Sequence, residues 1–428
     1  MTYSITCTTP LYYNRSESSQ PVRFFVGQAP GLRRPLRPPL FLAAAMLLCG
    51  AGCQTAGRLL IWPPQCDHCF GMDRTDRVLA LDWLRGLGVL IMLQGHLFNS
   101  FARADLHNHP VYVLSQFIGG MPAPIFLFLV GATLAFRLDR GDREGLAPGA
   151  RLRSALRRAA FLAAIAFAFR FQLWLFAWGN PWTEIVRVDI LNCMAFGVAA
   201  LSPVALLAPR KRITWCAAAG LAIAGLAPVV STLDWSGAPW LVRNYMVPNK
   251  AFFSFFPDAA YIAFGAGFGA LLRTGAPARD RVMQWAACFG LALVVTAHYF
   301  SNLPFSIYPN SDFWLNSPGL IFIRFGIVLV LAAAGFVWIA AQQPDKLYFM
   351  RRLGTNSLLI YWVHVELVYG RWFWFAKERL TIGECAAASL LLIALMYGLA
   401  TLNLPTRVER RWHRWRAAAP APETAWPR

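Results

Sequence analysis

Ten apolar stretches, each about 18–25 residues long, follow one another between residues 79 and 403. A helix of that length crosses the ~30 Å hydrocarbon core of a bilayer. Lipid offers no partner to open backbone groups, so such segments must span it as helices. We therefore predict an all-α, polytopic integral membrane bundle of about ten transmembrane helices. The predicted spans are residues 79–101, 112–136, 155–178, 185–208, 213–230, 254–273, 283–300, 317–341, 353–372 and 383–403.

The composition agrees with a chain that lies largely in lipid. The 428 residues are 57% hydrophobic and 14% charged, against roughly 45–50% and 25% in soluble domains. A net charge of +19 is typical of chains that bind nucleic acid. Here the arginines stand in short clusters between apolar stretches, as in loops of membrane proteins. We therefore predict a lipid bilayer as partner and no nucleic acid.

The positive charges alternate from one connecting segment to the next. Arg and Lys cluster in residues 137–158, 210–212, 273–281, 346–352 and 407–416, and the intervening segments are poor in both. Positively charged loops of membrane proteins stay in the cytoplasm. The pattern therefore predicts that both termini of the bundle are cytoplasmic, in what we expect to be a bacterial inner membrane.

The chain divides into three parts by composition. Residues 1–71 form a doubtful leader: they are signal-like, disordered, or a spurious extension before Met72. Residues 72–405 form the predicted transmembrane domain. Residues 406–428 form a basic tail, which the charge pattern places in the cytoplasm.

The first predicted span carries polar residues along one face. At 100° per residue, Asp82, Arg85, Met92 and His96 lie within about 80° of one another, along roughly 21 Å of helix. Charged residues inside a membrane are costly, and they mark functional sites or contacts between helices. Two interpretations follow: a structural ion pair with an interhelical hydrogen bond from His96, or a catalytic path that ends at His96.

Two further groups contain histidine. His107 and His109 lie in the first outer loop, in a pattern too weak for zinc, and we predict no metal site. Ser357, Tyr361 and His364 share one face of the ninth span. That face belongs either to a packing network or to the wall of a ligand tunnel.

Other intramembrane residues require partners or close packing. Asp189 and Asn192 open the fourth span, and Arg324 lies deep in the eighth, where it needs a carboxylate such as Asp258 or a bound anion. Gly265 and Gly269 form a G-x-x-x-G pattern. We interpret this pattern as close helix packing and not as a nucleotide site, because no strand precedes it.

Four motifs occur in the order found in one family of membrane enzymes. They are Asp82-x-x-Arg85-Gly86 with His96 ten residues beyond the glycine, residues 121–132, residues 188–191 and residues 353–364. Together they resemble the heparan-alpha-glucosaminide N-acetyltransferase catalytic-domain family, a branch of the transmembrane acyltransferases related to acyltransferase-3. The resemblance covers about residues 77–400.

The resemblance implies an acyltransferase that moves an acetyl or other acyl group from cytoplasmic acyl-CoA. The acceptor would be a sugar hydroxyl or amine of an envelope glycan across the membrane. Acetyl-CoA would be a co-substrate, with no bound cofactor. In the family's eukaryotic heparan enzyme the essential histidine follows the first helix. The catalytic candidates are therefore His96, His107, His109 and Asp82.

Further residues are candidates for the donor and substrate path. They are Arg85, Asp189, Asn192, Arg324, Asn356, Ser357, Tyr361 and His364. Two other functions use the same intramembrane charges: a transporter or flippase, and a non-catalytic assembly factor for a glycan. Binding of acyl-CoA distinguishes the enzyme from both. A homodimer is left open by the sequence.

Overall fold

The computed structural model describes residues 79–177, 181–249, 253–273, 276–308, 310–341 and 348–402. All of them belong to one compact unit. The described part of the chain is helical and has no strand, apart from one isolated bridge between Ala102 and Leu380. The predicted all-α fold is therefore confirmed. The predicted leader and tail lie outside the described residues.

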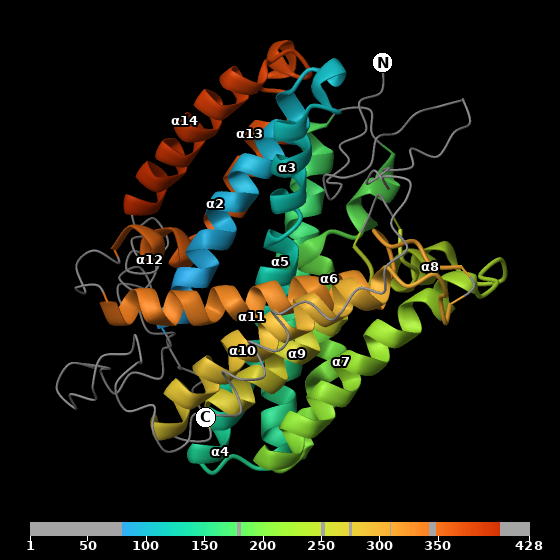
Figure 1. The fold of residues 1–428 in the computed structure, drawn as a ribbon, viewed down its shortest axis with the longest axis vertical. Helices are drawn as coiled ribbons and strands as arrows, with labels where there is room; N and C mark the ends of the chain where they lie inside the picture. Colours follow the sequence, from blue (N-terminus) through green and yellow to red (C-terminus); the bar gives the residue numbers. More distant parts are fainter. Residues whose placement is uncertain are drawn as a thin grey trace, which may run out of the picture. The chain divides into compact units, whose positions relative to one another are not determined.

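Helices of very different length make up this unit (Figure 1). The α-helices are α2 (Leu79–Phe101), α3 (Pro110–Gly119), α4 (Pro122–Arg143), α5 (Pro148–Phe176), α6 (Ile190–Leu201), α7 (Pro209–Thr232), α8 (Trp240–Met246), α9 (Phe255–Leu272), α10 (Ala276–Ser301), α11 (Pro318–Ala341), α12 (Tyr348–Thr355), α13 (Ser357–Tyr369) and α14 (Ile382–Thr401). Short 3-10 turns are η1 (Ala104–Leu106), η2 (Trp182–Val186), η3 (Ser202–Leu206) and η5 (Trp374–Ala376).

Each of the ten predicted spans overlaps helical residues, but the helices differ in length and in how apolar they are. Among the described residues, 7 helical stretches are long and apolar enough to cross a membrane, with α3 and α4 taken as one. Helix α2 has 23 residues, but the polar residues on one of its faces lower its mean hydropathy. The fourth and ninth spans hold shorter helices, α6 with 12 residues and α13 with 13. Each begins directly after a residue with non-helical backbone angles, which is Asp189 for α6 and Asn356 for α13.

Helix α9 packs tightly against α4 and α7. A side chain at Gly265 would collide with the carbonyl oxygen of Phe128, and one at Gly131 with that of Ile262. At Gly269, a Cβ would lie 2.8 Å from the Cα of Ala132. The predicted role of the G-x-x-x-G pattern in helix packing is thereby confirmed.

The substitution Gly265→Ala is expected to destabilise the bundle. The added methyl forces α4 and α9 apart, and overpacking of this kind costs about 1–3 kcal/mol. Thermal unfolding in detergent would show a lower midpoint. Gly398→Ala in α14 is the matched control, because a Cβ there meets nothing within 4 Å. An equal loss of stability in both variants would contradict this account of the packing.

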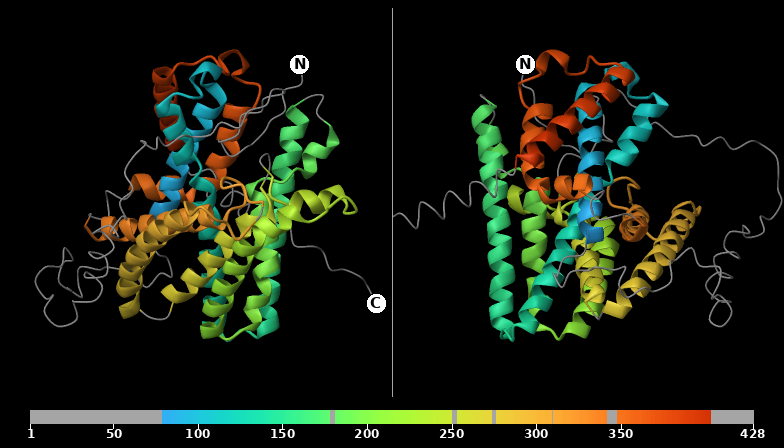
Figure 2. Two further views of the ribbon diagram at one scale, coloured as in Figure 1. Left: turned by 45° about the vertical axis from the view of Figure 1, so that its right-hand side comes forward. Right: turned by 90° about the vertical axis from the view of Figure 1, so that its left-hand side faces the viewer.

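Acidic residues near the C-terminal end of α4 form ion pairs with arginines at the ends of other helices. Asp142 forms ion pairs with Arg151 of α5 and Arg212 of α7, the latter with a contact of 3.0 Å. Asp139 lies 3.5 Å from Nε of Arg273, beyond the end of α9. Figures 1 and 2 show the α4–α5 connection at the same end as the start of α7. The arginine-rich ends of these helices thus lie on one side, as their alternation in the sequence predicts.

Helix α2 lies among α3, α12, α13 and α14 (Figure 1). Glycines allow its backbone to approach its neighbours closely. Gly86 faces the carbonyl of Met350, and Gly354 faces the carbonyl of Asp82. In the C-terminal half of α2, a Cβ on Gly95 would lie 2.9 Å from the Cα of Gly119. These contacts hold α2 closely against α12 near its N-terminal end and against α3 near its C-terminal end.

Candidate functional site

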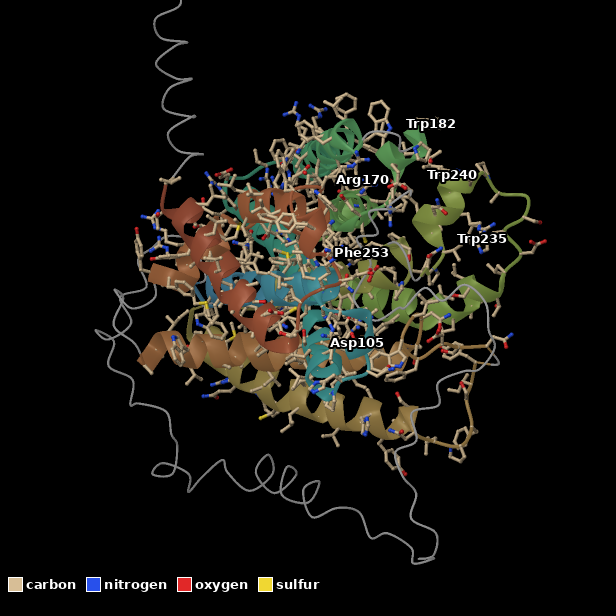
Figure 3. The ribbon with its side chains drawn as sticks, turned by 90° about the horizontal axis from the view of Figure 1, so that it is seen from above. Asp105, Arg170, Trp182, Trp235, Trp240 and Phe253 are labelled. Atoms are coloured by element: carbon tan, nitrogen blue, oxygen red, sulfur yellow. The ribbon has the colours of Figure 1, made fainter. Side chains whose placement is uncertain are left out.

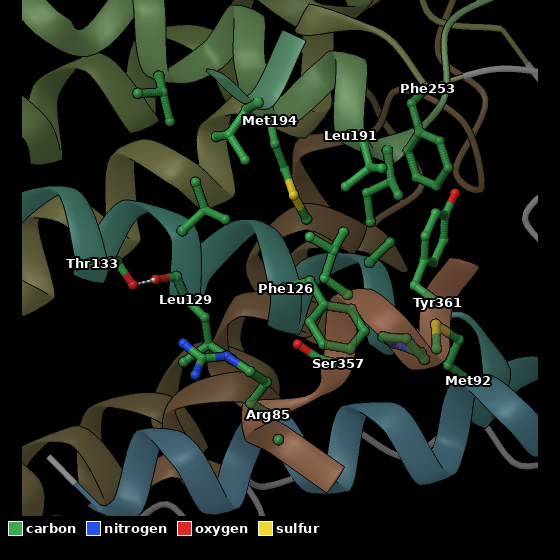
Figure 4. A pocket seen from close by; sticks show the side chains of 18 of the residues that line it. Arg85, Met92, Phe126, Leu129, Thr133, Leu191, Met194, Phe253, Ser357 and Tyr361 are labelled. Atoms are coloured by element: carbon green, nitrogen blue, oxygen red, sulfur yellow. Dashed lines mark hydrogen bonds between the residues drawn. The ribbon is translucent and has the colours of Figure 1, made fainter. Parts of the chain in front are cut away.

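A cavity of about 330 Å³ is lined mainly by residues of α2, α4, α5, α6 and the α12–α13 junction. Helix α2 contributes Arg85, Met92 and His96, which lie on the face that the helical spacing predicts. Figure 4 shows Arg85 at one end of the cavity, Phe126 in its middle, and Met92 with Tyr361 at the other end. Arg85 and His96 are eleven residues apart, which corresponds to about 16 Å along a helix.

The end of the cavity at Arg85 is positively charged. Arg85, Arg137 of α4 and Arg158 of α5 all line the cavity, and Arg158 lies close enough to the other two to interact with their charges. Arg85 donates to Oδ1 of buried Asp82 at 2.9 Å, and Arg137 approaches Oγ of Ser154 at 3.4 Å. Within the described chain, neither Arg137 nor Arg158 forms an ion pair. Three guanidinium groups that line one cavity favour a bound anion, and their planar donors match phosphate oxygens.

The other end of the cavity contains a pair of histidines. Nδ1 of His96 lies 3.0 Å from Nε2 of His364, and the ring centroids are 5.2 Å apart. Nδ1 of His364 lies 2.8 Å from the carbonyl oxygen of Ile360. His364 is completely buried, whereas His96 is partly exposed and lines the cavity. Tyr361 flanks His364, and Tyr369 lies edge-on to His96.

The break between α12 and α13 aims the predicted polar face of α13 at the cavity. Asn356 has non-helical backbone angles, and its Nδ2 donates to the carbonyl of Arg352 at 3.0 Å. Ser357 and Tyr361 line the cavity, and His364 follows one turn later beside His96. The structure therefore brings the sequence candidates of α2 and α13 to one site.

The candidates at the start of α6 lie beside the cavity and do not line it. Asp189 caps the helix, since its Oδ1 accepts from the backbone N–H of Asn192 at 3.0 Å. Nδ2 of Asn192 donates to the hydroxyl of Tyr245 at 2.9 Å. Ile190 and Leu191, between these two polar residues, do line the cavity. Asp189 and Asn192 thus fix the end of α6 that forms part of the wall.

Other sequence candidates lie elsewhere. His109 caps α3, accepting from Val111 N at 3.2 Å, and His107 stacks on Tyr112 at 4.5 Å. Asp105 in the same loop is labelled in Figure 3, and a hydrogen bond from Arg103 lowers the pKa of its exposed carboxyl.

Arg324 does not line the cavity either. It faces Asp258 and Tyr261 of α9, and a Cβ on Gly120 would lie 3.1 Å from its Nη2. These neighbours place Arg324 where α11, α9 and the α3–α4 junction meet. Over the ranges that the structure describes, no group of three or more His, Cys, Asp or Glu could hold a metal ion.

Three charged residues were not predicted from the sequence. Arg137 and Arg158 line the cavity. In the sequence they belong to an arginine cluster of the kind expected in any cytoplasmic loop, so nothing distinguished them as cavity residues. Glu184 was also missed, although it pairs with the buried Arg170 at 2.8 Å and with Arg187 at 3.2 Å. Arg170 and Arg187 are both buried, and the need of a buried arginine for a carboxylate partner was the signal available in the sequence.

One known protein family matches the part of the chain that supplies most residues of this site. Residues 77–308 match the sequence profile described as "Heparan-alpha-glucosaminide N-acetyltransferase, catalytic". The matched segment includes His96, Arg137 and Arg158, and it ends before α13 begins. A search of curated proteins finds no match.

Proposed function

The chain belongs to the heparan-alpha-glucosaminide N-acetyltransferase catalytic-domain family, and from this we propose that it is an acyl-CoA-dependent membrane acyltransferase. The family and the apolar helices support a membrane acetyltransferase-like protein. The proposed donor is acetyl-CoA or another acyl-CoA on the cytoplasmic side. The proposed acceptor is a sugar hydroxyl or amine of an envelope glycan on the opposite side, in a bacterial inner membrane.

The observation that supports this proposal most is the cavity that connects three arginines with His96. Acyl-CoA carries phosphates at one end and a thioester at the other, joined by a long neutral arm. Arg85, Arg137 and Arg158 suit the phosphates, and Met92 and Phe126 supply an apolar wall for the arm. A volume of about 330 Å³ is at the low end for ligand sites. We therefore expect the arm inside and the nucleotide at the arginine-lined mouth.

In the proposed reaction His96 acts as general base. Its ring nitrogen takes the proton of the acceptor hydroxyl or amine, and the acceptor atom attacks the thioester carbonyl carbon. The tetrahedral intermediate then breaks its C–S bond, and the leaving thiolate of CoA receives the proton from His96. A second route, in which His96 carries the acyl group transiently, gives the same products but labels the protein.

The proposal is tested with purified protein in detergent and acetyl-CoA that carries a radiolabelled acetyl group. The expected results are saturable binding, and transfer of label to amino sugars or sugar hydroxyls offered as acceptors. Label on the protein itself would indicate the acyl-carrier route. A well-folded protein with neither binding nor turnover would overturn the proposal, and would favour a transporter or an assembly factor.

A further inference from the structure

We propose that His364 is a positioning residue for His96. It fixes the His96 ring in the tautomer whose Nε2 has a free lone pair for the cavity. The catalytic meaning of this inference rests on the proposed acyl transfer. The tautomers themselves follow from hydrogen bonds and can be measured without any activity.

The direction of the hydrogen-bond chain starts from the backbone. The carbonyl oxygen of Ile360 is an acceptor, so Nδ1 of His364, at 2.8 Å, must donate to it and carry a proton. In a neutral imidazole the other nitrogen is then an acceptor. Nε2 of His364 therefore accepts from Nδ1 of His96 at 3.0 Å. His96 carries its proton on Nδ1, and its Nε2 is left unprotonated.

The surroundings favour a neutral pair at rest. His364 is 0% exposed, and burial of an isolated charge is very costly. In the part of the chain that the structure describes, no carboxylate hydrogen-bonds to either ring. His364 thus acts as a neutral acceptor, in a position where many enzymes place an aspartate or glutamate.

The same arrangement serves the proton transfer. When Nε2 of His96 takes the acceptor's proton, the ring becomes an imidazolium whose Nδ1–H already points at a hydrogen-bond acceptor. His364 keeps its own proton on Nδ1 throughout, and the proton on His96 Nε2 passes to the departing thiolate. The aromatic rings of Tyr361 and Tyr369, 5.7 Å from His364 and 5.4 Å from His96, restrict rotation of both imidazoles.

Two substitutions at position 364 separate this role from packing. His364→Leu fills similar space without an acceptor, and His364→Gln places an amide oxygen near the position of Nε2. We expect kcat to fall at least about 100-fold in the leucine variant and less than about tenfold in the glutamine variant. KM for acyl-CoA should stay unchanged in both. Val365→Ala, at another buried position of α13, should retain the wild-type kcat.

Wild-type kcat in His364→Leu would overturn the inference. So would a glutamine variant that is folded yet as inactive as the leucine variant, since the acceptor would then not be what matters.

A direct measurement of the tautomers needs no turnover. The chain has 7 histidines, so ¹⁵N- and ¹³C-labelled histidine gives a tractable solid-state NMR spectrum in proteoliposomes. The signals are assigned from their loss in His96→Ala and His364→Gln. Both rings should carry the proton on Nδ1, and the His96 signal should stay so in His364→Gln. A proton on Nε2 of His96 would overturn the inference, whether or not the protein proves to be an acyltransferase.

Discussion

His96→Ala is expected to lower kcat for acyl transfer at least about 1,000-fold while acyl-CoA binds with unchanged affinity. A positioned general base contributes roughly 10²–10⁴-fold to a rate, and His96 is the imidazole that lines the cavity. The arginines at the other end, which would bind the phosphates, are untouched by the change. Turnover of labelled acetyl-CoA gives kcat, and equilibrium dialysis gives the dissociation constant.

The matched control for this prediction is His298→Ala, which removes an exposed imidazole from α10. The variants His107→Ala and His109→Ala decide between the three histidines that the family resemblance leaves open. Their positions at the start of α3 predict an intact acyl-transfer step in both. Loss of activity in one of these loop variants, with retention in His96→Ala, would move the catalytic centre to the loop before α3.

Reversing two charges at the mouth of the cavity is expected to weaken acyl-CoA binding about 100-fold or more. In the double variant Arg137→Glu with Arg158→Glu, two guanidinium donors are replaced by carboxylates that repel phosphate. Hydrogen bonds to charged groups contribute about 1.5–3 kcal/mol each, and a tenfold change in affinity corresponds to about 1.4 kcal/mol. The loss should appear in Kd and KM, with kcat at saturation retained.

The control for the mouth is Arg157→Glu, because Arg157 is an exposed neighbour of Arg158 that does not line the cavity. The control changes the net charge by the same amount as each substitution in the double variant, and it lies on the same helix as Arg158. Wild-type affinity in the double variant, or an equal loss in the control, would mean that the phosphates bind elsewhere.

Much of the fold was predictable because a chain that lies in lipid needs long apolar helices, and these are visible in the sequence. Long apolar stretches mark the helices, and arginine-rich connections mark the shared side where Asp142 joins Arg151 and Arg212. The polar face of α2 was visible as well, since Arg85 and His96 are related by helical spacing alone. The short α6 was not expected, because apolar composition does not show that the helix begins only after Asp189.

The site itself was only partly predictable. His96 and His364 were both candidates, but their contact joins residues 268 positions apart, and no local pattern encodes it. Arg137 and Arg158 lie in a cluster that any cytoplasmic loop would contain. Their place at the cavity depends on how α4 and α5 stand beside α2, which is a property of packing and not of spacing.

The late position of His364 has a consequence for how the protein is made. His96 is synthesised in the first described helix, and its partner arrives only with α13, near the end of the bundle. The hydroxyl of Ser100 likewise donates to the carbonyl of Val368 at 2.8 Å, and Val368 is also synthesised late, in α13. A nascent chain therefore contains the arginines and His96 long before the ring of His96 can be oriented by His364. On the proposed function, ribosome-stalled chains that stop after α11 are expected not to consume acyl-CoA, because His96 still lacks its partner His364.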